Sequence, residues 1–328
     1  MTVPDTRFDV TIAGEINLDL VLDGIPEPMP VERELLASAF RITLGSSAAI
    51  LAHNLSALGT RVGFASLAAR DEFSKMAMAY LAARNVDLSG IKYSDGPAGS
   101  GVTVVVNHGP VRHILSYLGT AGEMTGAHLD IDYLCSARHF HLSSLFLLKG
   151  LHKDLPSLFK AIRLRGLTIS LDTNDDPDDA WAGVLDELLP LIDVLLPNER
   201  ELLRITKTES IDAALAAVSR KVPLTVVKRG AKGAIIQQGD MRHIVPAIDV
   251  VPVDTIGAGD SFNAGFLACY VRGLPPAECA AMGNLTGAVS TMKPGGIEAF
   301  RDREFLRKSF AELAPGAAVL EALFPRRA

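Results

Sequence analysis

Residues 254–266, DTIGAGDSFNAGF, combine a glycine turn with an acidic side chain. Apolar residues follow at helical spacing, which predicts a helix whose first turn contains Asp260. The free N–H groups at a helix start can bind an anion such as phosphate, and glycines let it approach the backbone. A carboxylate there would repel phosphate, unless it takes the proton of a hydroxyl group that attacks the phosphorus. The pattern indicates either phosphoryl transfer or an acidic residue that merely favours the helix dipole.

The elements that must position this turn alternate between short β-branched runs and longer helical patterns. This alternation is typical of βαβ units and of a parallel sheet covered on both faces. Residues 46–59 predict one such helix, with Gly59 as its stop. We therefore predict an α/β fold with a doubly wound, mostly parallel central sheet flanked by helices, in a single domain over residues 1–328. Its strands are predicted at residues 8–14, 62–68, 138–143, 167–173, 193–198 and 224–230.

Two stretches, about residues 17–43 and 99–117, interrupt this rhythm. The second alternates around Gly109 and Pro110, which predicts a hairpin. Strands that belong to no βαβ unit either form a small sheet that covers a cleft as a lid, or extend one edge of the main sheet. Periodicity alone leaves both arrangements open.

Composition favours a globular enzyme, because 48% of the 328 residues are hydrophobic and 21% are charged. A formal net charge of -6 gives no broad attraction for nucleic acid or anionic lipid. Cys135, Cys269 and Cys279 are too few and too widely spaced for a disulfide framework. The amino-terminal residues lack the order of a signal peptide, and no uncharged apolar run approaches the roughly 20 residues of a membrane helix. We expect a cytoplasmic protein that acts on a small molecule.

Across its whole length, the stretch at 254–266 resembles the carboxyl-terminal signature of the ribokinase-like (PfkB-type) carbohydrate kinases. The resemblance implies a ribokinase-like fold with a small β-sheet lid. It also implies ATP-dependent phosphorylation of a hydroxymethyl group on a small sugar or sugar-like substrate. Asp260 would be the catalytic base, and the backbone of Gly257, Ala258 and Gly259 would form the anion hole.

The likeness extends to the predicted nucleotide side. Residues 198–201, NERE, resemble the family's N-x-x-E element, which implies that Asn198 and Glu201 organise Mg²⁺ and phosphate through water. By themselves these residues favour a helix start with acidic first-turn residues. Residues 226–236, VVKRGAKGAII, resemble the strand-loop-strand that borders ATP. The resemblance assigns ATP binding to Lys228, Gly230, Gly233 and Asn284, although a mid-helix asparagine that faces water is an alternative for the last.

Three short motifs carry the predicted substrate side. Residues 14–21, GEINLDLV, resemble the family's first strand and point to Asp19 and Asn17 as ligands of sugar hydroxyls. DTND, beginning at Asp172, resembles a D-x-N element and adds Asn174. The arginine that often follows this element is absent, which weakens the case for an acidic sugar.

The third motif, LGSSAAI, departs from the family's amino-terminal signature. Gly45 matches, but Ser46 replaces the second glycine and Ile50 stands at the position of an asparagine. Both Gly45 and Ser46 are expected to contact the sugar. The two replacements predict an altered substrate preference, since a site without a hydroxyl partner no longer rewards that hydroxyl.

Two further properties follow from the resemblance. Asp254, the backbone of Ile256 and residues 290–296 resemble the potassium-binding loops of some members, so K⁺ is an expected ligand. Lid strands in this family often supply a dimer contact, so a homodimer through the lid is expected.

Rival classes lack their signatures in this sequence. It contains no P-loop, no dinucleotide-binding glycine fingerprint after the first strand, and no serine nucleophile elbow. His139 and His141 share a strand face, where a packed pair is expected rather than metal ligands. Two alternatives stay open: a nucleoside kinase of the same fold, and a non-catalytic sugar- or nucleotide-sensing homologue, which would have no need of Asp260.

Overall fold

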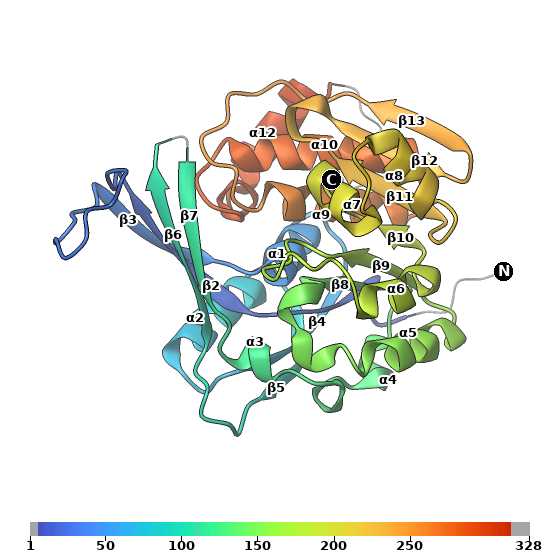
Figure 1. Ribbon diagram of the computed structural model, residues 1–328, viewed down its shortest axis with the longest axis horizontal. Helices are drawn as coiled ribbons and strands as arrows, with labels where there is room; N and C mark the ends of the chain where they lie inside the picture. Colours follow the sequence, from blue (N-terminus) through green and yellow to red (C-terminus); the bar gives the residue numbers. More distant parts are fainter. Residues whose placement is uncertain (1–5, 110, 316–328) are drawn as a thin grey trace, which may run out of the picture.

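The computed structural model describes residues 6–109 and 111–315, which form one large and one small β-sheet (Figure 1). Over this part of the chain, the large sheet has nine strands in the order β13-β12-β11-β10-β9-β8-β1-β4-β5. The strands from β11 to β5 in this order pair in parallel, whereas β12 and β13 add antiparallel strands at one edge. The bounds are β1 (Val10–Ala13), β4 (Val62–Ala68), β5 (Asp87–Tyr93), β8 (His139–Ser143), β9 (Thr168–Asp172), β10 (Val194–Leu195), β11 (Leu224–Lys228), β12 (Ala234–Gln238) and β13 (Met241–Val245).

This topology confirms the predicted doubly wound, mostly parallel sheet. All six predicted strands are present, although β10 is limited to two residues of the six predicted. Two edge strands, β5 and β13, were not predicted from the sequence.

Helices cover both faces of the large sheet and create two hydrophobic cores. Alternating side chains of one strand enter opposite cores: Val226 belongs to one and Val227 to the other. The first core lies under α1, α9, α10 and α12, and the second under α5 to α8. The helices are α1 (Ser47–Ala57), α2 (Glu72–Ala82), α3 (Thr120–Glu123), α4 (Ile131–Leu134), α5 (Leu155–Leu164), α6 (Val184–Leu188), α7 (Glu199–Thr206), α8 (Ile211–Val218), α9 (Ala258–Tyr270), α10 (Pro276–Thr291), α11 (Glu298–Arg301) and α12 (Arg303–Leu313). No helix within the described ranges is long and apolar enough to cross a bilayer.

The small sheet stands apart from the large one, at the left of Figure 1. Its strand order is β3-β2-β6-β7, with β2 and β6 parallel and the outer pairs antiparallel. The alternative that these segments extend the main sheet is therefore wrong. The predicted hairpin is the pair β6 and β7, but Pro110 of its turn lies outside the described residues. The bounds are β2 (Asn17–Asp23), β3 (Ala39–Leu44), β6 (Gly101–His108) and β7 (Val111–Tyr117).

The two strand histidines are packed inside the large sheet. Both ring nitrogens of His139 lie 2.7 Å from hydroxyl oxygens, those of Thr168 and Ser170. His141 contacts Ser170 at 2.6 Å and Ser143 at 2.9 Å. Hydroxyl groups thus satisfy both rings, as expected for a packed pair.

Candidate active site

The glycine turn lies at the start of α9, as predicted. Gly257 has a φ of 69°, and a Cβ there would lie 2.6 Å from the Cα of Gly296, so only glycine fits. The N–H of Ala258 donates to the carbonyl of Thr255 at 3.3 Å. Within the described chain, the amides of the turn that remain for an anion are therefore those of Gly257, Gly259 and Asp260. The expectation that Ala258 donates to the anion is weakened by this contact.

Asp260 lines two cavities at once, one of about 900 Å³ and one of about 230 Å³. Burial and the nearby Asp172 carboxylate raise the pKa of Asp260 to about 7, while Lys228 and a hydrogen bond from Ser47 oppose this rise. A carboxyl group with a pKa near neutrality is well suited to accept a proton at physiological pH.

The larger cavity lies at the ends of β9, β10 and β11, where Asp172, Asn198 and Lys228 all line it. The Nζ of Lys228 lies 2.5 Å from Oδ2 of Asp172, and this buried pair also contacts Asn263. A Cβ at Gly259 would lie 3.6 Å from the same Nζ. The ammonium group therefore lies next to the glycine turn, where it can stabilise a bound anion.

Asn198 and Glu201 form a capping box at the start of α7. The Asn198 side chain accepts the N–H of Glu201 at 2.9 Å, while both Glu201 oxygens accept from Asn198, at 2.8 and 2.5 Å. Burial and Asp172 raise the pKa of Glu201 to about 7. The helix-start interpretation is thus correct, and both residues also line the larger cavity. A direct bond from Glu201 to a metal would compete with these contacts, whereas contact through water would not.

The remaining predicted nucleotide residues line the same cavity. Gly230 and Gly233 border it in the loop between β11 and β12. Asn284 is 8% exposed and donates to the carbonyls of Val245 and Pro246, at 3.3 and 2.8 Å. It therefore does not face water, and it holds the chain after β13 against α10.

The smaller cavity gathers four of the five predicted substrate residues: Asn17, Asp19, Ser46 and Asn174. The pKa of Asp19 is raised to about 7 by burial and by the charges of Asp260, Asp254 and Glu15. The fifth predicted residue, Gly45, lies behind Asp19. A Cβ at Gly45 would lie 2.1 Å from the Oδ1 of Asp19, so the glycine makes room for this carboxylate.

Ser46 adopts a φ of 67°, a conformation that favours the glycine it replaces. Its hydroxyl caps α1 by accepting the N–H of Ala49 at 3.1 Å, and it donates to the carbonyl of Glu15 at 2.6 Å. These two bonds offset the backbone strain. Ile50 is buried at the edge of the cavity and packs beside Gly296.

Sequence reasoning did not identify several polar residues of the smaller cavity, among them Glu15, Arg112 and Ser144. Glu15 is buried, and its Oε1 accepts from Ser144 at 2.8 Å and from the N–H of Ser47 at 3.2 Å. Its Oε2 has no partner within the described residues. Glu15 could have been identified from its position two residues after β1, because active sites of parallel sheets lie beyond the carboxyl ends of strands.

Asp254 joins the glycine turn to the small sheet. Its Oδ1 accepts the N–H of Ile256 at 2.9 Å, and its Oδ2 accepts the N–H of Gly295 at 3.0 Å. The Nη2 of Arg41, on β3, lies 3.1 Å from the same Oδ2, and its Nη1 lies 2.5 Å from Asp23. A guanidinium group from the small sheet thus neutralises the carboxylate that the sequence assigned to K⁺.

Comparison with known proteins shows the family to which the chain belongs. The model of the pfkB family of carbohydrate kinases matches residues 8–303, and the chain belongs to this family. A cytidine kinase of Thermococcus kodakarensis is 30% identical over 285 residues, which is 84% of this chain and 93% of that protein.

Two solved structures share the fold. The ribokinase of Arabidopsis thaliana, complexed with ribose and ATP, is 23% identical and superposes with a TM-score of 0.76 over 92% of this chain and 98% of that one. An Escherichia coli protein assigned as a ribokinase II, in complex with ATP and Mg²⁺, is 23% identical with a TM-score of 0.80, over 92% and 99%. The protein is therefore a kinase with a ribokinase-like fold.

Proposed function

We propose that this kinase transfers the γ-phosphoryl group of ATP to a hydroxymethyl group of a small, neutral sugar. The observation that carries the proposal is the position of Asp260, whose carboxylate lines both cavities at their junction. A sugar in the smaller cavity and a triphosphate in the larger one would meet at this residue.

In the proposed reaction Asp260 takes the proton of the attacking hydroxyl group, a contribution worth about 10² to 10⁴ in rate. The free amides of Gly257 and Gly259, together with the Lys228 ammonium group, stabilise negative charge on the transferred phosphoryl group. Each of these groups lies on the large sheet or on a helix packed against it, so their positions are fixed before the substrate binds.

ATP and Mg²⁺ are the proposed cofactors. Carboxylates such as Glu201 in the larger cavity suit Mg²⁺, which keeps much of its water, and Asn198 and Glu201 would hold it through such water. When bound, the ion neutralises charge on the triphosphate. The ligands of the two structural relatives support this assignment.

The size of the smaller cavity favours a sugar over a nucleoside. At about 230 Å³ it is below the roughly 300–1,000 Å³ of pockets for drug-sized ligands, and it suits a single ring. No described residue donates a hydrogen bond to the Asp19 side chain, so its carboxylate is available for sugar hydroxyls. The similarity to a cytidine kinase keeps a nucleoside as the second candidate.

We further propose that the described chain forms one domain and that the small sheet acts as its lid. Asn17 and Asp19 on β2 and Arg112 on β7 face the smaller cavity, so closure would seal the sugar from water. A requirement for K⁺ stays a prediction, and Arg41 offers an alternative: its guanidinium group supplies the positive charge next to Asp254.

The lid also carries the proposed dimer contact. Three large apolar side chains on the face away from the cavity are 48% to 59% exposed: Phe40, Val111 and Leu115. Such a patch suits a two-fold contact between identical sheets. Sedimentation of Leu115→Lys should give a monomer. A cytoplasmic location stays a prediction.

The test of the proposed function is ADP release with a panel of pentoses, hexoses, ketoses and nucleosides. We expect one sugar to be phosphorylated with the highest kcat/KM, and the product to carry phosphate on a primary hydroxyl. A nucleoside as the best substrate would establish the second candidate. Absence of turnover with every acceptor, with ATP binding retained, would favour a sensing homologue instead.

A further inference from the structure

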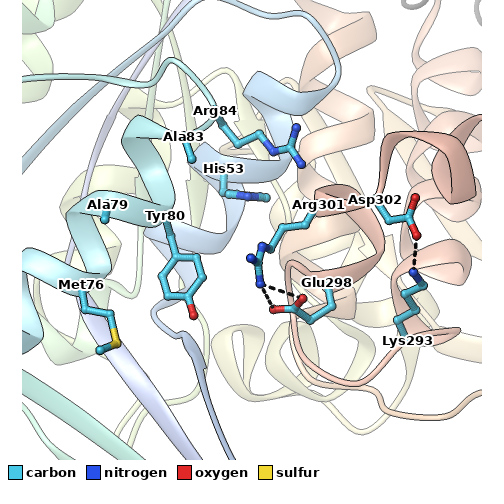
Figure 2. A pocket seen from close by; sticks show the side chains of 10 residues that line it. All are labelled: His53, Met76, Ala79, Tyr80, Ala83, Arg84, Lys293, Glu298, Arg301 and Asp302. Carbon is cyan, nitrogen blue, oxygen red and sulfur yellow. Dashed lines mark hydrogen bonds and ion pairs between the residues drawn. The ribbon is translucent and has the colours of Figure 1, made fainter.

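A third cavity, of about 820 Å³, lies outside the catalytic cleft and shares no residue with either of its cavities. It lies between α1, α2 and the segment from Lys293 to Asp302, as Figure 2 shows. Met76, Ala79 and Tyr80 of α2 form an apolar wall. The opposite wall is charged, so the cavity suits a ligand with both a carbon skeleton and a charged group.

Three cations and two acids line the charged side of this cavity. Lys293 lies 2.8 Å from Asp302, and Arg301 lies 3.0 Å from Glu298, so these two acids are already neutralised. Arg84 has no carboxylate partner among the described residues; burial and the charges of Arg301 and Arg303 lower its pKa. The guanidinium group of Arg84, which no carboxylate neutralises, therefore lines this cavity, although the chain as a whole has a net charge of -6.

His53, only 1% exposed, points into the cavity beside Arg84 and Arg301 (Figure 2). Its Nδ1 lies 2.8 Å from the Oδ1 of Asn54, whose Nδ2 donates to Ser261 and to the carbonyl of Gly296. The Oδ1 must therefore accept, so Nδ1 carries the proton and Nε2 is left as an acceptor. Burial lowers the pKa of His53 to about 4, which keeps the ring neutral.

We propose that this cavity binds a small phosphate-bearing anion, such as hydrogen phosphate or a phosphomonoester. Arg84 and Arg301 would hold the anionic oxygens, as guanidinium groups do in phosphate sites. The Nε2 of His53 would accept a hydroxyl hydrogen of the same ligand. Any carbon skeleton would pack on Tyr80 and the alanines of α2.

The site is connected to the catalytic helix through Asn54. Ser261, which accepts from Asn54 at 3.0 Å, directly follows Asp260, and Gly296 lies against the glycine turn. A second connection runs through Glu298, which contacts both Arg301 and Thr43 of the small sheet. An anion in this cavity would thus contact groups that position both the base and the lid, as an effector does.

The experiment measures thermal unfolding of the full chain with increasing inorganic phosphate, at constant ionic strength and with a Mg²⁺–ATP analogue saturating the catalytic cleft. Phosphate at ten times its dissociation constant should raise the melting temperature by about 2–4 °C. Arg84→Gln should abolish this rise, and Arg84→Lys should keep part of it. The control Arg165→Gln, on an exposed arginine that pairs with Asp132, should keep all of it.

Two results would overturn the proposal: no phosphate-dependent rise in the wild type, or an equal rise in Arg84→Gln. Sulfate separates the role of His53, because it lacks a hydroxyl hydrogen at neutral pH and should stabilise less than phosphate. Equal stabilisation by sulfate would exclude that role. None of these measurements depends on turnover, so they are independent of the assigned reaction.

Discussion

The two cavities that meet at Asp260 are built from different parts of the molecule. The larger one is lined by residues at the ends of buried parallel strands, where Lys228 pairs with Asp172 and Glu201 is held by hydrogen bonds from Asn198. The smaller one takes much of its wall from the small sheet, whose strand β7 is exposed along all seven residues.

This difference separates the residues proposed to transfer the phosphoryl group from those proposed to recognise the sugar. Groups that transfer the phosphoryl unit lie on elements that cannot move without opening a core. Part of the sugar cavity is lined by the exposed strand β7, which can shift or be replaced at low cost in stability. Substitutions in the larger cavity should therefore affect stability and turnover together, whereas substitutions in the lid should affect only the binding of the sugar.

The largest effect is expected for Lys228→Met. Removal of the ammonium group leaves Asp172 buried without its partner, which should lower the free energy of unfolding by about 3–5 kcal/mol. Urea denaturation measures this loss. The double variant Lys228→Met with Asp172→Asn should recover part of the stability; a loss below about 1 kcal/mol in the single variant would show that this cavity is not rigidly held.

The pH dependence of the reaction sharpens the same point. Because the pKa of Asp260 is raised to about 7 and the base must be deprotonated, kcat/KM for the sugar should rise about tenfold per pH unit below 7 and level off above it. Lys228 lowers the pKa of Asp260, so any turnover retained by Lys228→Met should show the rise at higher pH. A flat profile between pH 5 and 8 would contradict this assignment.

A smaller effect is expected at the lid, for Arg41→Gln. Loss of the contact between β3 and Asp254 should raise KM for the sugar about tenfold, while the free energy of unfolding changes by less than about 1 kcal/mol. If Arg41 takes the place of K⁺, added K⁺ should lower this KM in the variant and have no effect on the wild type. The control is the same change at Arg33, an exposed arginine in the segment that connects β2 with β3. If Arg41→Gln lowered the free energy of unfolding by several kcal/mol, the proposed independence of the lid from the large sheet would be contradicted.

Sequence predicted the buried part of the fold better than its edges. Strand β4, for example, is a nearly continuous run of apolar and small residues, which is typical of a parallel sheet covered on both faces. The edge strand β13 is largely exposed and β5 is only partly buried, so neither carries such a pattern and both were missed. The predicted run at 193–198 yields only two strand residues, because Pro197 cannot donate to a ladder.

For the site, the sequence predicted local geometry but not the pairs between distant residues. The glycine turn, Asn198 and Glu201 were predicted because each motif carries its own geometry within a few residues. The pair of Lys228 with Asp172 spans 56 residues and exists only after the strands align. The contact of Arg41 with Asp254 spans 213 residues and depends on where the small sheet stands, which no periodicity specifies.

The measurement that tests the central claim most directly is a single-turnover assay of Asp260→Asn on the best sugar, with bound ATP at saturation. Loss of the base should slow phosphoryl transfer about 10²- to 10⁴-fold and leave ATP affinity nearly unchanged. The control Asp178→Asn changes an exposed acid that pairs with Lys149, and it should match the wild type. Transfer by Asp260→Asn within about threefold of the wild-type rate would show that another group takes the proton.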